Sequence, residues 1–332
     1  MVSFSSSSLA SFVDERWVFL LSNQRRESGN RTATSLTTDQ YRRPFQRDYD
    51  KVIFSSAFSR LKDKTQVFPL ASHDSVHNRM NHSLEVHAVG KTLVRALFDS
   101  EYKVHNQIFH SGSNEKTTTM MMNEQTWYHR SMIMRDMEDI VATAALLHDI
   151  GNPPFGHSGE EAMRKWWHYW RPPGEWAVSE YWDRLKTNVI FDDFKNFEGN
   201  ATGFRVIQQK IPKLTFATMT TYMKYPCMAS GRPKNGGRYK KNGIYMADLF
   251  KYKQMTDECR LTMNYTDMTA DEDTEKNDPT REFSWMRHPS TYLVEAADDI
   301  CYLVVDIEDG ARMKVISYES AREQLLKLCP SN

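Results

Sequence analysis

An adjacent histidine and aspartate, His148 and Asp149, follow the apolar run from Ala144 to Leu147. Neighbouring residues on a helix point about 100° apart, because the helix has about 3.6 residues per turn. An imidazole and a carboxylate placed in this way can hold one metal ion from two sides. A buried helix end with a structural histidine and a capping aspartate is the alternative interpretation, and this pair alone does not decide between the two.

The pair must be positioned by a helix that ends close to it. Ile140, Val141, Ala144 and Leu147 recur at helical spacing. Pro153 and Pro154 follow shortly afterwards, and proline ends a helix because it lacks the amide donor and clashes with the preceding turn. The sequence therefore predicts a buried helix whose end delivers the His-Asp pair.

A second candidate pair, His157 and Glu160, lies beyond the proline break. Ser158 and Glu161 have the Ser-x-x-Glu spacing of a capping box, which predicts a helix that begins at Ser158. His157 would then lie just before the helix and Glu160 in its first turn, where the helix dipole favours anions. Such a histidine can contact phosphate or give a proton to a leaving oxygen, whereas an exposed loop histidine is the structural alternative.

Two basic stretches precede these motifs. The segment from Arg60 to Phe68 contains Lys62, Lys64 and Gln66, which form either a solvated polar patch or a rim that binds a polyanion. A further helix is predicted to open at Arg79. His82 follows three residues later, so the two side chains share a face. The apolar stripe of this helix is Val86, Val89, Leu93 and Leu97.

The last informative helix runs from Pro289 to Asp306 and is predicted to be buried on most of its circumference. Asp298, Tyr302 and Asp306 recur every four residues and so line one face. Burying charged groups is costly unless they are paired or bind a metal. The pattern therefore favours a functional site.

Four of these residues form a coherent ligand set: His82, His148, Asp149 and Asp298. Two imidazoles and two carboxylates suit a divalent ion such as Mn²⁺, Mg²⁺, Fe²⁺, Co²⁺ or Zn²⁺, and the absence of thiolates argues against a soft-metal site. An ion held in this way can polarise a phosphate and lower the pKa of bound water.

Composition sets the remaining bounds. The 332 residues contain 43 basic and 43 acidic side chains, so no overall charge points to nucleic acid or a membrane. No apolar run reaches the ~18 residues that a membrane crossing needs. The four cysteines are scattered, which predicts a reducing, cytoplasmic setting. Strand-like alternation is scarce, so we expect an all-α fold. We expect a partly disordered arm over 1–40 and a helical domain over 41–332, with insertions near 99–135 and 227–285.

The ordered motifs resemble those of the HD-domain phosphohydrolases. The stretches S-S-A-F-S-R-L-K-D-K-T-Q-V-F-P, R-M-N-H-S-L-E-V, A-L-L-H-D-I-G-N-P-P-F-G-H-S-G-E-E-A, F-E-G-N-A and Y-L-V-E-A-A-D-D-I-C-Y are similar to those of the deoxyguanosine triphosphate triphosphohydrolases and related dNTP triphosphohydrolases. The resemblance runs from about Tyr41 to about Gly310, with gaps at the two insertions. The chain stops soon after Gly310, so we expect it to lack the family's C-terminal extension.

The resemblance implies an all-α HD fold that cleaves a dNTP at the α-phosphorus, with dGTP as the first candidate substrate, to give a deoxynucleoside and triphosphate. It also implies one divalent ion (Mn²⁺, Mg²⁺ or Co²⁺) per site and a homo-oligomer. By motif position, His82, His148, Asp149 and Asp298 match metal ligands, and His157 and Glu160 match a catalytic pair. The residues that match substrate contacts are Gln66, Arg79, Asn200, Lys224, Tyr302 and Asp306.

Two alternatives stay open at this point. Another HD phosphohydrolase would act on a nucleoside monophosphate or a cyclic nucleotide. A truncated regulatory subunit would bind a nucleotide without turnover. The sequence does not decide whether the protein binds nucleic acid.

Overall fold

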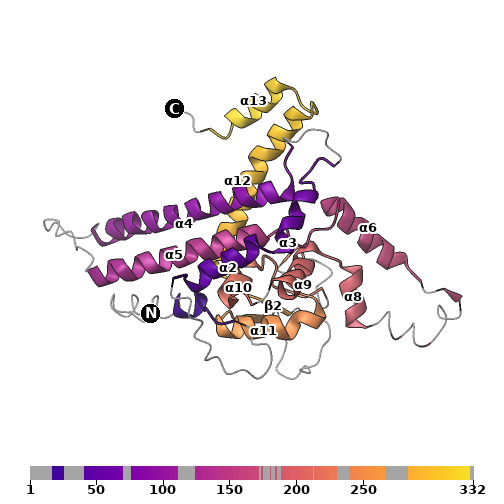
Figure 1. Ribbon diagram of the computed structural model, residues 1–332, viewed down its shortest axis with the longest axis horizontal. Coiled ribbons are helices and arrows are strands. Elements are labelled where there is room, and N and C mark those ends of the chain that lie inside the picture. The colour runs from indigo at the N-terminus through magenta and orange to yellow at the C-terminus, as the bar shows by residue number, and fades with distance from the viewer. Residues whose placement is uncertain are drawn as a thin grey trace.

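The computed structural model describes a helical protein (Figure 1). The only strands in its described part are β1 (Met263–Tyr265) and β2 (Phe283–Trp285), which pair antiparallel. This confirms the all-α fold predicted from the sequence. The structure describes residues 17–25, 41–69, 76–110, 124–171, 173–174, 180, 184, 188–211, 213–229, 239–265 and 283–329.

Three long helices form the frame of the molecule. They are α4 (Arg79–His110), α5 (Glu124–Leu147) and α12 (Pro289–Arg312). Helices α4 and α5 lie side by side, and α12 packs across both (Figure 1). Val86, Val141 and Ala297 are buried where the three meet, and burial of a large aliphatic side chain contributes about 1.5–3 kcal/mol.

The shorter helices surround this frame. The described ones are α2 (Pro44–Ile53), α3 (Ser56–Ser59), η1 (Arg60–Asp63), α6 (Gly156–Tyr169), α8 (Val189–Lys195), α9 (Gly199–Lys210), α10 (Phe216–Tyr222), η3 (Met246–Asp248), α11 (Leu249–Glu258) and α13 (Tyr318–Leu326). None of the helices in the described part combines the length and the apolar character that a membrane crossing requires.

The predicted helix before the His-Asp pair is α5. Every residue from Ile140 to Leu147 is buried, so its last two turns lie inside the core. The helix ends at Leu147, directly before His148. The amide of Ile150 still reaches the carbonyl of Leu147, at 3.0 Å, which tightens the end of the helix. The core thus fixes the point at which the pair leaves the helix.

Helix α4 begins at Arg79, where the sequence predicts a helix start. Helix α4 ends and helix α5 begins within the stretch near 99–135, which the sequence predicts to be an insertion. The residues between them, 111–123, lie outside the described residues, as do parts of the stretch near 227–285.

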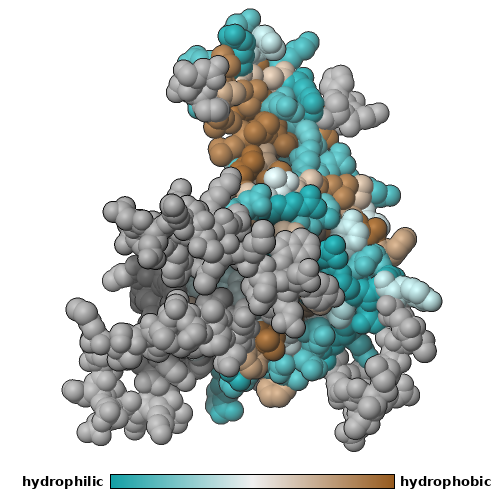
Figure 2. All heavy atoms as spheres, turned by 90° about the vertical axis from the view of Figure 1, so that its left-hand side faces the viewer, coloured by the Kyte–Doolittle hydropathy of each residue, from teal (hydrophilic) through white to brown (hydrophobic). Residues whose placement is uncertain are grey.

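The predicted burial of α12 on most of its circumference is wrong for its second half. Ala297, Cys301 and Val305 are buried, but Ile300 and Leu303 are 45% and 52% exposed. This half leaves the frame and is joined by α13 (Figure 1). Figure 2 shows apolar surface on this projecting part. The apolar composition of the helix does not reveal that only one of its faces is covered.

Part of the predicted N-terminal arm packs against the domain. Leu20 is buried, and its carbonyl accepts a hydrogen bond from Nε2 of His288 at 2.8 Å. Burial lowers the pKa of His288 to about 4, so this ring is neutral near pH 7. Arg25 forms an ion pair with the fully buried Asp48. The other residues of the arm, 1–16 and 26–40, lie outside the described residues.

The loop after the His-Asp pair is pressed against α9 at Gly151. A Cβ atom on Gly151 would lie 2.1 Å from the carbonyl oxygen of Gly199 and 2.1 Å from the amide nitrogen of Gly203. Both are backbone atoms, so neither can rotate away. We expect Gly151→Ala to lower the free energy of unfolding by about 3 kcal/mol, because overpacked sites relax only by moving backbone.

Urea unfolding measures this effect, with Gly310→Ala as the matched control. A Cβ on Gly310 meets only side-chain atoms of Ile316 at 3.4 Å. Alanine also favours a helix over glycine by about 1 kcal/mol, so this variant should be no less stable than the parent. Equal stability of the Gly151 variant and the parent would contradict the close packing of the loop on α9.

Candidate metal centre and active site

Three predicted metal ligands from distant parts of the chain meet at one point. His82 comes from α4, His148 from the end of α5 and Asp298 from α12. Oδ1 of Asp298 lies 3.0 Å from Nε2 of His82 and 3.5 Å from Nε2 of His148. Within the described part of the chain, this is the one group of such side chains close enough to hold a metal ion.

The orientation of His148 fits a bound cation. Its Nδ1 lies 2.7 Å from the carbonyl oxygen of Ala145. Because a carbonyl only accepts, the proton of the neutral ring is on Nδ1, and the lone pair of Nε2 faces Asp298. Nε2 is buried and has no hydrogen-bond partner among the described residues. A lone pair aimed at a carboxylate is unfavourable unless a cation lies between them, which is the arrangement of a metal-binding histidine.

Asp149, the fourth predicted ligand, is adjacent to the cluster. Its Oδ2 lies 3.6 Å from Nε2 of His148, and the same oxygen accepts a hydrogen bond from Arg79 at 2.5 Å. Asn152 donates to its other oxygen. Burial raises the pKa of Asp149, but His148 and Arg79 outweigh burial and lower it. The role of Asp149 as a ligand stays a prediction.

Asp298 also lies beside three side chains that favour its ionised form, His148, His82 and Lys224. Burial favours its neutral form, but His148, the hydrogen bond from His82 and the ammonium of Lys224 together lower the pKa of this carboxyl. Nζ of Lys224 lies 3.6 Å from Oδ2 of Asp298 and 3.8 Å from Glu295. The carboxylate is therefore ionised near neutral pH and available to a metal ion.

The helix that carries the second candidate pair begins earlier than the sequence predicts. Helix α6 starts at Gly156 rather than Ser158, and its N-cap, Phe155, has a left-handed backbone with φ 65°. Glu161 is exposed and pairs with Lys165 at 2.5 Å, so the predicted capping box does not form. The φ of Gly156 is +52°, and its missing Cβ leaves room for Arg79. This turn, rather than a Ser-Glu cap, starts the helix.

His157 and Glu160 form a pair across one turn of α6. Nδ1 of His157 lies 3.0 Å from Oε2 of Glu160. Glu160 is buried and accepts the amide of Gly199 at 2.9 Å, whereas the His157 side chain is 81% exposed. Burial raises the pKa of Glu160, but the contacts from His157, Lys241 and Gly199 outweigh burial and lower it. The carboxylate therefore orients an accessible imidazole.

One cavity of about 760 Å³ connects these groups. This is a usual size for a small-molecule site. Nine predicted site residues line the cavity: Gln66, Arg79, His148, Asp149, His157, Asn200, Lys224, Asp298 and Tyr302. His82 and Glu160 are buried behind it, where they contact Asp298 and His157. The structure thus brings eleven of the twelve predicted residues to one place.

Asp306, the twelfth residue, does not line the cavity. It forms a hydrogen bond with Tyr302, one turn earlier on α12, and lies close enough to His82 for a favourable charge interaction. Burial raises the pKa of Asp306, and these two contacts only partly oppose burial. A direct substrate contact for Asp306 stays a prediction.

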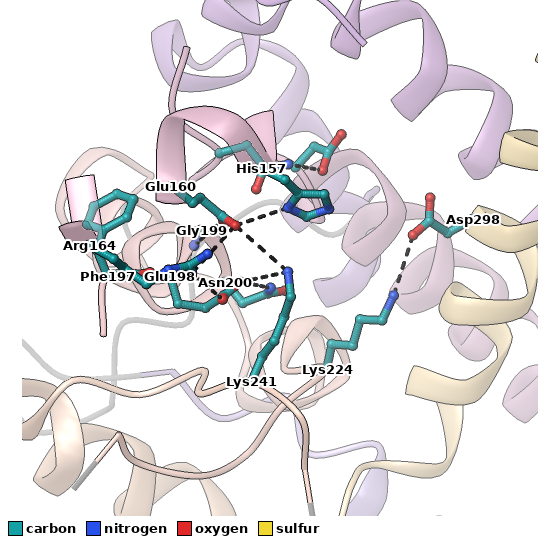
Figure 3. Close-up of polar contacts among 12 residues, drawn as sticks. His157, Glu160, Arg164, Phe197, Glu198, Gly199, Asn200, Lys224, Lys241 and Asp298 are labelled. Carbon is teal, nitrogen blue, oxygen red and sulfur yellow. Dashed lines mark hydrogen bonds and ion pairs between the residues drawn. The ribbon is translucent and has the colours of Figure 1, made fainter. Parts of the chain in front are cut away.

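The structure adds polar contacts near the site that the sequence interpretation did not predict. Nζ of Lys64 donates to the carbonyl of Asn152 at 2.7 Å and holds the loop after the His-Asp pair. Glu198 and Lys241 lie next to Glu160 (Figure 3). Glu198 belongs to the F-E-G-N-A motif, which is one of the motifs that carry the family resemblance. Lys241 lies in a stretch rich in glycine and lysine, where no periodicity points to a site.

Comparison with known proteins places this geometry in a family. Residues 79–179 match the HD domain. A deoxyguanosinetriphosphate triphosphohydrolase-like protein of Pseudomonas aeruginosa (strain LESB58) is 38% identical over 294 residues, which cover 86% of this chain and 56% of that protein. One from Synechocystis is 34% identical over 297 residues, which cover 86% of this chain and 58% of that protein. The deoxyguanosinetriphosphate triphosphohydrolase of Yersinia enterocolitica is 30% identical over 317 residues, which cover 88% of this chain and 55% of that protein.

The helical fold and the His-Asp cluster define the class, and the chain is an HD-domain protein. Within that class it is similar over most of its length to deoxyguanosinetriphosphate triphosphohydrolase-like proteins, which confirms the resemblance seen in the sequence. The chain spans a little more than half the length of the curated relatives that it matches.

Proposed function

We propose that this protein hydrolyses deoxynucleoside triphosphates in a metal-dependent reaction, with dGTP as its preferred substrate. The products are a deoxynucleoside and inorganic triphosphate. One observation carries the proposal: the His82-His148-Asp298 cluster and the His157-Glu160 pair serve the same cavity. A site for a divalent ion beside a positioned imidazole is suited to hydrolysis of a phosphate ester.

The other lining residues suit the parts of a dNTP. Arg79 and Lys224 bring positive charge to the cavity, and cationic side chains are the usual partners of phosphate oxygens. Gln66 and Tyr302 present an amide and a phenol group at the wall of the cavity, and these groups can hydrogen-bond to a sugar hydroxyl. Names of the relatives that include deoxyguanosinetriphosphate support the choice of dGTP as the first substrate.

The proposed reaction breaks the bond between the α-phosphorus and the 5′ oxygen. The oxygen of a water molecule forms the new bond to phosphorus, and the deoxynucleoside leaves with its 5′ oxygen. A divalent ion at His82, His148 and Asp298, with Asp149 as the proposed fourth ligand, would polarise the phosphate and lower the pKa of bound water. The Nδ1 of His157 is held by Glu160, so its Nε2 takes up a proton from solvent and then gives that proton to the leaving 5′ oxygen.

Product analysis tests this proposal. The protein is incubated with each of the four dNTPs and with Mg²⁺, Mn²⁺ or Co²⁺, and the products are separated. We expect triphosphate and a deoxynucleoside, fastest with dGTP. A nucleoside monophosphate and a cyclic nucleotide are tested in parallel: orthophosphate from the first would indicate a monophosphatase, and a nucleotide from the second a phosphodiesterase. Measurable nucleotide binding without hydrolysis under any of these conditions would indicate a regulatory subunit.

The homo-oligomeric state and the cytoplasmic setting stay predictions from the sequence.

A further inference from the structure

Two buried carboxylates and two cations form a cluster behind His157 (Figure 3). The side chains of Glu160 and Glu198 are only 1% and 3% exposed. Nζ of Lys241 lies 3.3 Å from Oε1 of Glu198 and 3.9 Å from Oε2 of Glu160. Nη1 of Arg164 lies 3.7 Å from Glu198 and 3.9 Å from Glu160. Each cation therefore lies between the same two carboxylates.

The charges in this cluster balance, two negative against two positive. Burial of an ionised carboxylate costs several kcal/mol unless opposite charge and hydrogen bonds compensate. Removal of either cation would leave two close carboxylates with one positive partner. One of them would then take up a proton or turn towards solvent. Glu160 is the carboxylate whose position matters for His157, because its Oε2 contacts both the imidazole and the cations.

The two cations differ in how they are held. Nη1 of Arg164 also donates to the carbonyl of Phe197 at 3.0 Å, so this guanidinium has a structural role as well. Lys241 lines the cavity. Its backbone carbonyl accepts from Sγ of Cys227 at 3.1 Å, and the amide of Gly243 donates to the Cys227 carbonyl at 3.1 Å. The chain is thus anchored where the Lys241 side chain begins.

We infer that Lys241 is a positioning residue of the active site, acting through Glu160 on His157. Its ammonium compensates Glu198 and Glu160 together. Glu160 then stays ionised and turned towards His157, and the imidazole keeps its proton on Nδ1 and Nε2 directed to the cavity. This inference rests on the proposed function of the site. It assigns a role to a residue outside the motifs from which the site was predicted.

A direct contact between Lys241 and substrate phosphate is the competing role, and kinetics separate the two. Loss of a positioning residue lowers kcat, whereas loss of a ground-state contact raises KM and leaves kcat unchanged. We therefore compare Lys241→Met, Lys241→Arg and Lys240→Met in kcat, KM and metal content. Lys240 is an exposed neighbour and serves as the matched control.

For Lys241→Met we expect kcat to fall about 10- to 100-fold. This is less than the 10²- to 10⁴-fold rate effect of a general acid, because His157 itself is still present. KM and the affinity for inorganic triphosphate should stay within about threefold of the parent. Lys241→Arg should recover most of kcat, because it restores the charge, and Lys240→Met should match the parent. A rise in KM with unchanged kcat, or a Lys241→Met variant that matches Lys240→Met, would overturn the inference.

A second readout does not need turnover. Nitrogen-15 spectra of histidine-labelled protein report which ring nitrogen carries the proton, and the His157 signal is assigned by its absence in His157→Gln. We expect the Nδ1-protonated form in the parent and in Lys240→Met, and a mixture of forms in Lys241→Met. An unchanged His157 signal in Lys241→Met would refute the positioning role. If the parent hydrolyses no dNTP, the proposed function fails and this spectrum still decides the role of Lys241.

Discussion

Replacing His157 by alanine lowers kcat by about 10²- to 10⁴-fold, the usual contribution of a general acid or base. The metal content and the fold should stay unchanged. The His157 side chain is 81% exposed, so its removal uncovers little apolar surface. Glu160 keeps the amide of Gly199 and the nearby cations of Arg164 and Lys241. The loss should therefore appear in turnover and leave stability unaffected.

His168→Ala is the matched control, because His168 is also an exposed histidine of α6 but does not line the cavity. Metal content, melting temperature and kcat are measured on the same preparations. Glu160→Ala should lose turnover as well, and also some stability, because the buried amide of Gly199 loses its acceptor. The assigned role of His157 is wrong if His157→Ala sheds its metal or keeps kcat within about threefold of the parent.

Asp298→Asn should abolish tight binding of a divalent ion, and activity with it. The substitution removes the charge of the carboxylate that contacts both His82 and His148, while its size is retained. In the parent, saturating Mn²⁺ should raise the free energy of unfolding, by about 2.7 kcal/mol at 100 times the dissociation constant. The variant should gain much less. This stabilisation is measured by thermal or urea unfolding, and metal analysis of the purified proteins checks it.

The neighbouring Asp299→Asn is the control, because Asp299 is an exposed residue of the same helix. It should bind metal and be stabilised like the parent. Asp149→Ala then decides the fourth ligand: a loss of metal equal to that of Asp298→Asn would establish Asp149 as a ligand. Equal metal content and equal stabilisation in the parent and in Asp298→Asn would contradict the proposed centre.

The sequence predicts the frame well, because its signals are local. The apolar spacing before His148 and the prolines after it are enough to predict a buried helix that ends at the pair, and α5 ends at Leu147. The order of the motifs then identifies the family. Family resemblance brings in residues that no local pattern joins, such as His82 and Asp298, which lie 216 positions apart and meet at 3.0 Å.

The predictions that were wrong depend on tertiary contacts. The helix start at Ser158 assumed a local cap, but the structure packs Glu160 against the amide of Gly199 and begins α6 two residues earlier, at Gly156. The apolar residues of α12 suggest burial on most of its circumference, yet Ile300 and Leu303 are about half exposed among the described residues. Lys241 reaches Glu160 from a stretch without periodicity. No local pattern reports such a contact.

The most direct measurement of the central claim is hydrolysis of dGTP in water enriched in oxygen-18, with a divalent ion present. Attack of water on the α-phosphorus places one labelled oxygen on a terminal phosphorus of inorganic triphosphate and none on the 5′ hydroxyl of deoxyguanosine. Phosphorus NMR and mass spectrometry of the two products locate the label. We predict labelled triphosphate and unlabelled deoxyguanosine. Label in deoxyguanosine, or orthophosphate, pyrophosphate or a nucleotide as the first product, would contradict the proposed reaction.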